Sequence, residues 1–159
     1  MSTVLSVDIE QEESLKIIEE LDLSMIKFKL CIPVKQEGKG WTPEHADNCE
    51  KWYKRFLKLH VLCPNATIVP SRTIDEMWHA HILDTRKYHK DCESIFGCYL
   101  HHFPYFGLRG EEDAENLHKA LASTKILFEE FFGESLDGLS SLCDGGCAGG
   151  GGDGGGECS

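Results

Sequence analysis

Residues 42–65 read TPEHADNCEKWYKRFLKLHVLCPN and decide the fold class. Thr42 has a side chain suited to capping a helix, and a proline follows at the first helical position. Apolar side chains then recur at three- and four-residue intervals, the spacing of one face of an α-helix. They are Cys49, Trp52, Phe56, Leu59 and Cys63. The stretch therefore predicts an amphipathic helix that ends at the Pro64-Asn65 turn and buries one face.

Similar helical periods lie on both sides of this stretch, each delimited by proline or glycine. The expected helices are one or two between Glu12 and Cys31, one from Ser71 or Thr73 to about Phe96, and one from the run EEDAEN to Phe132. The acidic start of the last helix suits the positive end of a helix dipole. We predict an all-α fold, a compact bundle of four to five helices.

The composition changes sharply after Gly133, which divides the chain into a helical domain at 1–133 and a tail at 134–159. The tail holds ten of the sixteen glycines, five acidic residues, and neither lysine nor arginine. It has little apolar surface to bury, so ordering it would not be offset by burial. We expect a flexible, acidic Gly/Cys-rich tail.

Charge and hydropathy exclude several classes of partner. The formal net charge is −11, and no cluster of lysine and arginine is present to bind a nucleic-acid backbone. No apolar run approaches the roughly 18 residues that span a membrane, and the start MSTVLSVDIEQEE does not resemble an export signal. We expect a cytoplasmic protein with reduced cysteines, no membrane association, and a protein or a modifying enzyme as its partner.

The predicted helix before Phe96 carries the densest set of coordinating side chains. Residues 75–110 hold five of the eight histidines. At about 100° per residue, His79 and His81 point in different directions and cannot chelate one ion together. A helical projection places the following residues on the buried stripe: Ile74, Trp78, His81, Thr85, Tyr88 and Cys92. His79 lies on the flank one turn after Asp75, where an imidazole to carboxylate hydrogen bond is expected.

His81 has two interpretations. It is either a neutral core histidine that hydrogen-bonds a loop carbonyl or Tyr88, or a metal ligand together with Asp84 and one of His101 and His102. Two imidazoles and a carboxylate suit zinc or ferrous iron. Adjacent loop histidines usually point apart, so at most one of them can join the site.

The loop CYLHHFPYFGLRG connects this helix to the last one. We expect it to pack Phe103, Tyr105 and Phe106 over the histidine helix. The alternative is an aromatic groove for a peptide or small ligand, with Arg109 as an anion anchor.

The stretch IVPSRTIDEMWHAHILDTRKYHKDCESIFGCYLHHFPYFGLRG is similar to the signature region of the glycine-rich domain-containing protein family, and the likeness extends over most of residues 20–133. The resemblance implies that its motif positions are Trp78, His79, His81, Asp84, His101, His102, Pro104 and Tyr105. Of these, Trp78, His79, His81, His102, Pro104 and Tyr105 are expected to form a structural motif. The resemblance implies no catalytic activity for the shared domain.

Three functions follow from these observations, with an enzyme as the least favoured reading. The first is a non-enzymatic helical binding or scaffold module that presents the tail. The second is a metal protein that uses the domain histidines, or the tail residues Cys143, Cys147 and Cys158. The third is the leader domain of a precursor whose Cys/Gly-rich tail is modified by an enzyme.

Overall fold

The structure, a computed structural model, describes residues 7–137 and 139. These residues form six α-helices and one 3-10 helix, with no strand among them. The elements are α1 (Ile9–Glu19), α2 (Ser24–Cys31), η1 (Val34–Gln36), α3 (Pro43–Leu62), α4 (Arg72–Leu83), α5 (Thr85–Phe96) and α6 (Glu111–Phe132). The predicted all-α class is confirmed, with one helix more than expected.

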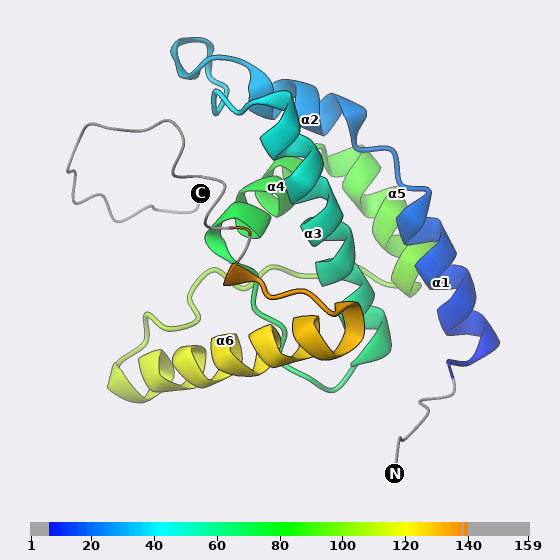
Figure 1. Cartoon of the computed structure of the whole chain (residues 1–159), viewed down its shortest axis with the longest axis vertical. Coiled ribbons are helices and arrows are strands. Elements are labelled where there is room, and N and C mark those ends of the chain that lie inside the picture. The colour runs from blue at the N-terminus through cyan, green and yellow to red at the C-terminus, as the bar shows by residue number, and fades with distance from the viewer. Residues whose placement is uncertain (1–6, 138, 140–159) are drawn as a thin grey trace.

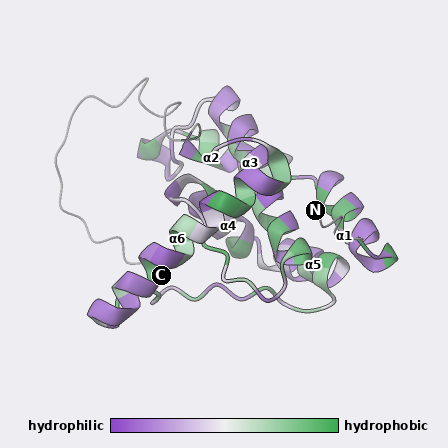
Figure 2. Ribbon diagram, turned by 60° about the horizontal axis from the view of Figure 1, so that its bottom comes forward, coloured by the Kyte–Doolittle hydropathy of each residue, from purple (hydrophilic) through white to green (hydrophobic). Residues whose placement is uncertain are grey.

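Helix α3 lies at the centre of the bundle, and α1, α2, α4 and α6 all pack against it (Figure 1). Its predicted start is confirmed, because the Thr42 side chain accepts a hydrogen bond from the His45 backbone N–H at 3.1 Å. The buried residues of α3 are Ala46, Cys49, Trp52, Tyr53, Phe56, Leu57 and Leu59. Figure 2 shows hydrophilic residues along the N-terminal part of α6, whose buried residues Thr124 and Phe128 lie in its second half.

The expected continuous helix up to Phe96 is two helices, α4 and α5, with a break at Asp84. There the backbone turns away from helical geometry, with φ −80° and ψ 72°. A straight helix would separate residues 78 and 88 by about 15 Å along its axis. Instead, Trp78 Nε1 donates a hydrogen bond to the Tyr88 hydroxyl at 2.9 Å. The break folds α5 back onto α4, so the projected residues do not form one continuous helical stripe and Thr85 is exposed, although Tyr88 and Cys92 are buried as expected.

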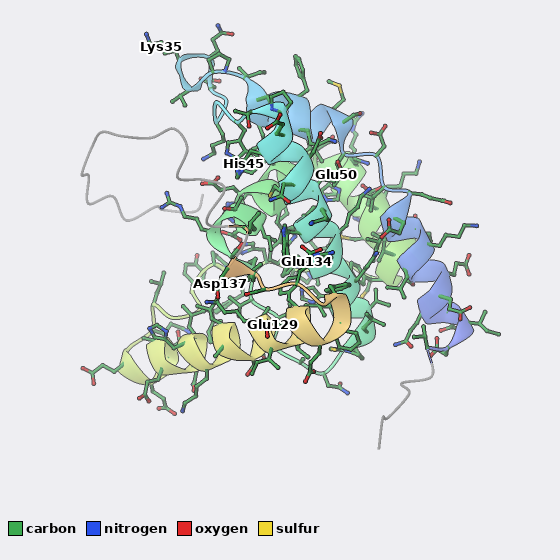
Figure 3. All side chains as sticks on the ribbon, viewed as in Figure 1. Lys35, His45, Glu50, Glu129, Glu134 and Asp137 are labelled. Atoms are coloured by element: carbon green, nitrogen blue, oxygen red, sulfur yellow. The ribbon has the colours of Figure 1, made fainter. Side chains whose placement is uncertain are left out.

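The ordered domain extends past the expected boundary at Gly133. Gly133 ends α6 in the left-handed region, with φ 69°. The chain then returns toward α3, where Lys51 and Arg55 donate to the Glu134 carboxylate at 3.1 and 3.0 Å (Figure 3). Leu136 and Leu139 are only 5% and 1% exposed and belong to the hydrophobic core. The tail residues from 140 onward, including Cys143, Cys147 and Cys158, lie outside the described residues.

His60, near the end of α3, gives the fold a specific pH dependence. Its ring meets Phe56 edge-on at 4.8 Å, and Nε2 is buried with no hydrogen-bond partner among residues 7–137 and 139. Burial lowers the pKa of His60 to about 4, against about 6.5 in an unfolded chain. As the pH falls from 6.5 to 4, the unfolded state therefore takes up the proton first. The stability that the neutral ring provides above pH 6.5 is lost through this window.

We therefore expect His60→Phe to flatten the loss of stability between pH 6.5 and 4, by up to about 1.4 kcal/mol per pH unit. Urea unfolding at a series of pH values measures this slope. The matched control is His118→Gln, which removes an exposed histidine of α6 and should leave the slope unchanged. Equal slopes in wild type and His60→Phe would show that His60 does not titrate in this window.

Within the part of the chain that the structure describes, none of the helices combines the length and apolar character needed to cross a bilayer.

Candidate metal centre

Three ligating side chains converge beside the N-terminal half of α4. Asp75 and His79 are one turn apart on α4, and His102 comes from the loop that follows α5. His102 Nε2 lies 2.8 Å from Asp75 Oδ1 and 3.0 Å from His79 Nε2. His79 Nε2 lies 3.3 Å from Asp75 Oδ2, at ion-pair distance rather than in the hydrogen bond expected from the sequence. The two imidazoles thus face different oxygens of the Asp75 carboxylate, and one ligand atom from each side chain lies within 4.8 Å of the other two.

The separations in this cluster match those of ligands around a metal ion. Zinc to nitrogen and oxygen bonds of about 2.0–2.2 Å place neighbouring ligand atoms roughly 2.9 to 3.4 Å apart in octahedral or tetrahedral geometry. The observed distances of 2.8 to 3.3 Å are close to that spacing, but His102 faces Oδ1 and His79 faces Oδ2 of Asp75. A small divalent cation would bind either both carboxylate oxygens, or one of them after the carboxylate turns.

Protons alone do not satisfy the cluster. If both Nε2 atoms carry hydrogen, the rings of His79 and His102 present two N–H groups to each other at 3.0 Å. If one of them is bare, its lone pair faces a carboxylate oxygen of Asp75. With Asp75 ionised and each N–H donating to a single acceptor, no placement of protons makes all three contacts hydrogen bonds. A cation at the centre would satisfy all three ligand atoms at once.

The cluster is half-buried. The side chains of Asp75, His79 and His102 are 27%, 32% and 17% exposed. The indole of Trp78 lies against the His102 ring, with centroids 4.5 Å apart. Three protein ligands with partly exposed side chains leave a metal further coordination positions for water or another small ligand.

His81 lies in a separate, buried network and does not join this cluster. Its Nδ1 is 2.7 Å from the Tyr53 hydroxyl, and its Nε2 is 2.8 Å from Asp91 Oδ2. Burial lowers the pKa of His81, against the opposing effect of Asp91. Burial also raises the pKa of Tyr53. The ring is thus neutral, with Tyr53 donating to Nδ1 and Nε2–H donating to Asp91.

The structure therefore does not bring together the ligand set His81, Asp84, His101 and His102 that the sequence suggested. Asp84 forms the break between α4 and α5, where its N–H caps α4. His101 is exposed and packs against Tyr99 at 4.8 Å, so the two adjacent histidines point apart as expected. The expected burial of His81 is confirmed. Its hydrogen-bond partners, however, are Tyr53 and Asp91 rather than a loop carbonyl or Tyr88.

The loop after His102 is held to α6 rather than packed over α4. Asp113 accepts hydrogen bonds from the Gly107 and Arg109 backbone N–H groups at 2.7 and 3.2 Å, and it also pairs with the Arg109 guanidinium. Gly107 has φ +89°, and a Cβ there would lie 2.4 Å from Leu117. The charge of the Arg109 guanidinium is thereby paired with the Asp113 carboxylate. This removes the reason to interpret Arg109 as an anion anchor.

The expected packing of the aromatic loop over the histidine helix does not hold for Phe103 and Tyr105. Phe103 and Tyr105 are 54% and 60% exposed and meet each other edge-on at 5.5 Å. Pro104 and Tyr105 belong to a turn at residues 104–107. Within the expected structural motif, the His102 ring contacts the rings of Trp78 and His79.

Sequence reasoning missed the roles of four residues in these networks. Asp75 was recognised as a partner of His79, but neither was identified as a metal ligand, although Asp-x-x-x-His on a helix places both groups on one face. No sequence signal identifies Asp91 or Tyr53 as partners of His81. Asp91 reaches His81 only because the chain folds back at Asp84, and Tyr53 comes from another helix.

A family model described as UCP032817-like matches residues 13–125, more than half of the 159-residue chain. The chain belongs to the UCP032817-like family. This corrects the resemblance to the glycine-rich domain-containing protein family, because the matching model is a different one. No curated protein and no solved structure matches the chain significantly.

Proposed function

We propose that the protein binds a divalent transition metal, zinc or ferrous iron, through Asp75, His79 and His102. The convergence of three ligand atoms, all within 4.8 Å of one another, carries the proposal. Two imidazoles and one carboxylate suit both metals. The three-ligand set and the partial exposure of its side chains support a metal that keeps an exchangeable position rather than a closed structural site.

His102→Ala should lower the affinity for zinc by more than the roughly 10- to 100-fold that outer-shell partners typically contribute, because it removes a direct ligand. Isothermal titration with Zn²⁺, after dialysis against a chelator, measures the affinity. Asp75→Asn should also weaken binding, since it removes the negative charge while keeping the side-chain size.

The matched control is His101→Ala, which removes the adjacent exposed histidine and should leave the affinity unchanged. Replacing Cys143, Cys147 and Cys158 with serine separates a site in the domain from one in the tail, and should also have no effect. Wild-type protein without a binding site of at least micromolar affinity would refute the proposal. Equal losses in His101→Ala and His102→Ala would refute the assignment of ligands.

A second proposal keeps the expected role as a binding module. Phe103, Tyr105 and Leu108 expose large apolar side chains on the loop that carries His102. Such residues are suited to contacting a partner or ligand next to the metal. The thiols of Cys31, Cys63, Cys92 and Cys98 form no disulfide among the described residues, which suits a reducing compartment such as the cytoplasm.

A further inference from the structure

The three residues of the cluster are positioned by different means. Asp75 and His79 are held in register by one turn of α4, and the helix backbone fixes their separation. His102 lies in the segment between α5 and α6, where the backbone is not helical. Its place in the cluster therefore depends on contacts that hold the loop.

The Tyr88 hydroxyl makes the contact that ties this loop to the helices. Tyr88 is 1% exposed on α5. Its O–H donates to the Leu100 carbonyl at 2.5 Å, two residues before His102. Burial raises the pKa of Tyr88 far above its usual range, so the hydroxyl stays protonated and remains a donor. One hydroxyl thus fixes the loop backbone next to His102.

The same hydroxyl also fixes the surface on which the His102 ring rests. Trp78 Nε1 donates to Tyr88 at 2.9 Å, and the Trp78 ring is tilted 39° to that of His102, with centroids 4.5 Å apart. Trp78 is 5% exposed and precedes His79 on α4. The Trp78 indole therefore packs against the His102 imidazole, and its hydrogen bond to Tyr88 fixes the position of the indole.

We infer that Tyr88 is a positioning residue: by binding Trp78 and the Leu100 carbonyl, its hydroxyl holds His102 against Asp75 and His79. As far as metal affinity is concerned, the inference rests on the proposed function. The placement of His102 itself does not, because it can be measured in metal-free protein. Tyr88 is not itself a metal ligand. It acts through the loop, at the Leu100 carbonyl, and through the Trp78 indole.

Tyr88→Phe removes one oxygen and keeps the ring, which makes it the direct test. The chain offers a matched control in Tyr53→Phe, which removes an equally buried hydroxyl from α3. That hydroxyl binds His81 and not the loop. We expect Tyr88→Phe to weaken Zn²⁺ binding by about 10- to 100-fold, the usual effect of an outer-shell partner. Tyr53→Phe should leave zinc affinity unchanged even though it also destabilises the fold.

The second measurement uses histidine-ring ¹⁵N–¹H NMR spectra of chelator-treated protein. In Tyr88→Phe, the His102 resonances should shift toward those of exposed His101, whereas Tyr53→Phe should not move them. Unchanged His102 resonances in Tyr88→Phe, or equal changes in both variants, would overturn the inference. If wild type binds no zinc but only Tyr88→Phe releases His102, the positioning role stands and the proposed metal function fails.

Discussion

Replacing Leu136 and Leu139 with alanine should lower the free energy of unfolding by about 4 to 8 kcal/mol, since each buried leucine contributes roughly 2 to 5 kcal/mol. Both side chains lie in the hydrophobic core, at 5% and 1% exposure. Typical domains unfold with only about 5 to 15 kcal/mol. The double variant should therefore be partly unfolded at room temperature. This effect follows entirely from residues beyond the boundary that composition suggested.

Urea titration followed by circular dichroism measures this loss. Leu108→Ala is the matched control, because Leu108 is 76% exposed and its truncation creates no cavity. It should change stability by less than about 0.5 kcal/mol. A double variant that loses less than about 1 kcal/mol would show that the segment after Gly133 does not stabilise the domain.

The second large effect concerns His81. Replacing it with alanine should cost about 3 to 5 kcal/mol, because the change opens a cavity and also leaves the buried Tyr53 hydroxyl without its acceptor. Asp91 loses the His81 donor at the same time and keeps its ion pair with Lys87, at 2.9 Å. The loss combines cavity formation with an unsatisfied polar network.

His79→Ala is the natural comparison, measured in chelator-treated protein. Its side chain is 32% exposed, and its contacts to Asp75 and His102 are not fully satisfied by protons. We expect a loss below about 1 kcal/mol. Denaturant titration of the two variants gives both values. Similar losses would mean that the buried network around His81 contributes no more than a surface contact.

Helices with strong local signals could be predicted from the sequence. The Thr42 cap and the apolar stripe define α3, and the acidic first turn with Gly133 defines α6. The break at Asp84 could not be predicted, because neither glycine nor proline marks it. It is stabilised by contacts between α4 and α5 rather than by local preference. Tertiary contacts of this kind override helix propensity.

In the proposed metal centre, His102 was predicted from the sequence as a candidate ligand and Asp75 was expected to contact His79, but neither of these two was predicted to be a ligand. The four-residue spacing of Asp75 and His79 places both on one helical face whatever the rest of the chain does. The choice of His102 over His101 depends on the path of the loop, which the contact of Leu100 with Tyr88 determines. The apolar spacing of Leu136 and Leu139 was obscured by the glycine-rich composition around them.

The break at Asp84 also bears on the order in which the protein folds. The hydrogen bonds that join α4, α5 and the loop span 10 to 12 residues, and those of the His102 cluster span 23 and 27. The bonds from α3 to Glu134 span 79 and 83 residues. Closing short loops costs less chain entropy than closing long ones. Helices α4 and α5 and the loop that carries His102 can therefore assemble early as a nearly self-contained unit. Leu136 and Leu139 would pack against the core later.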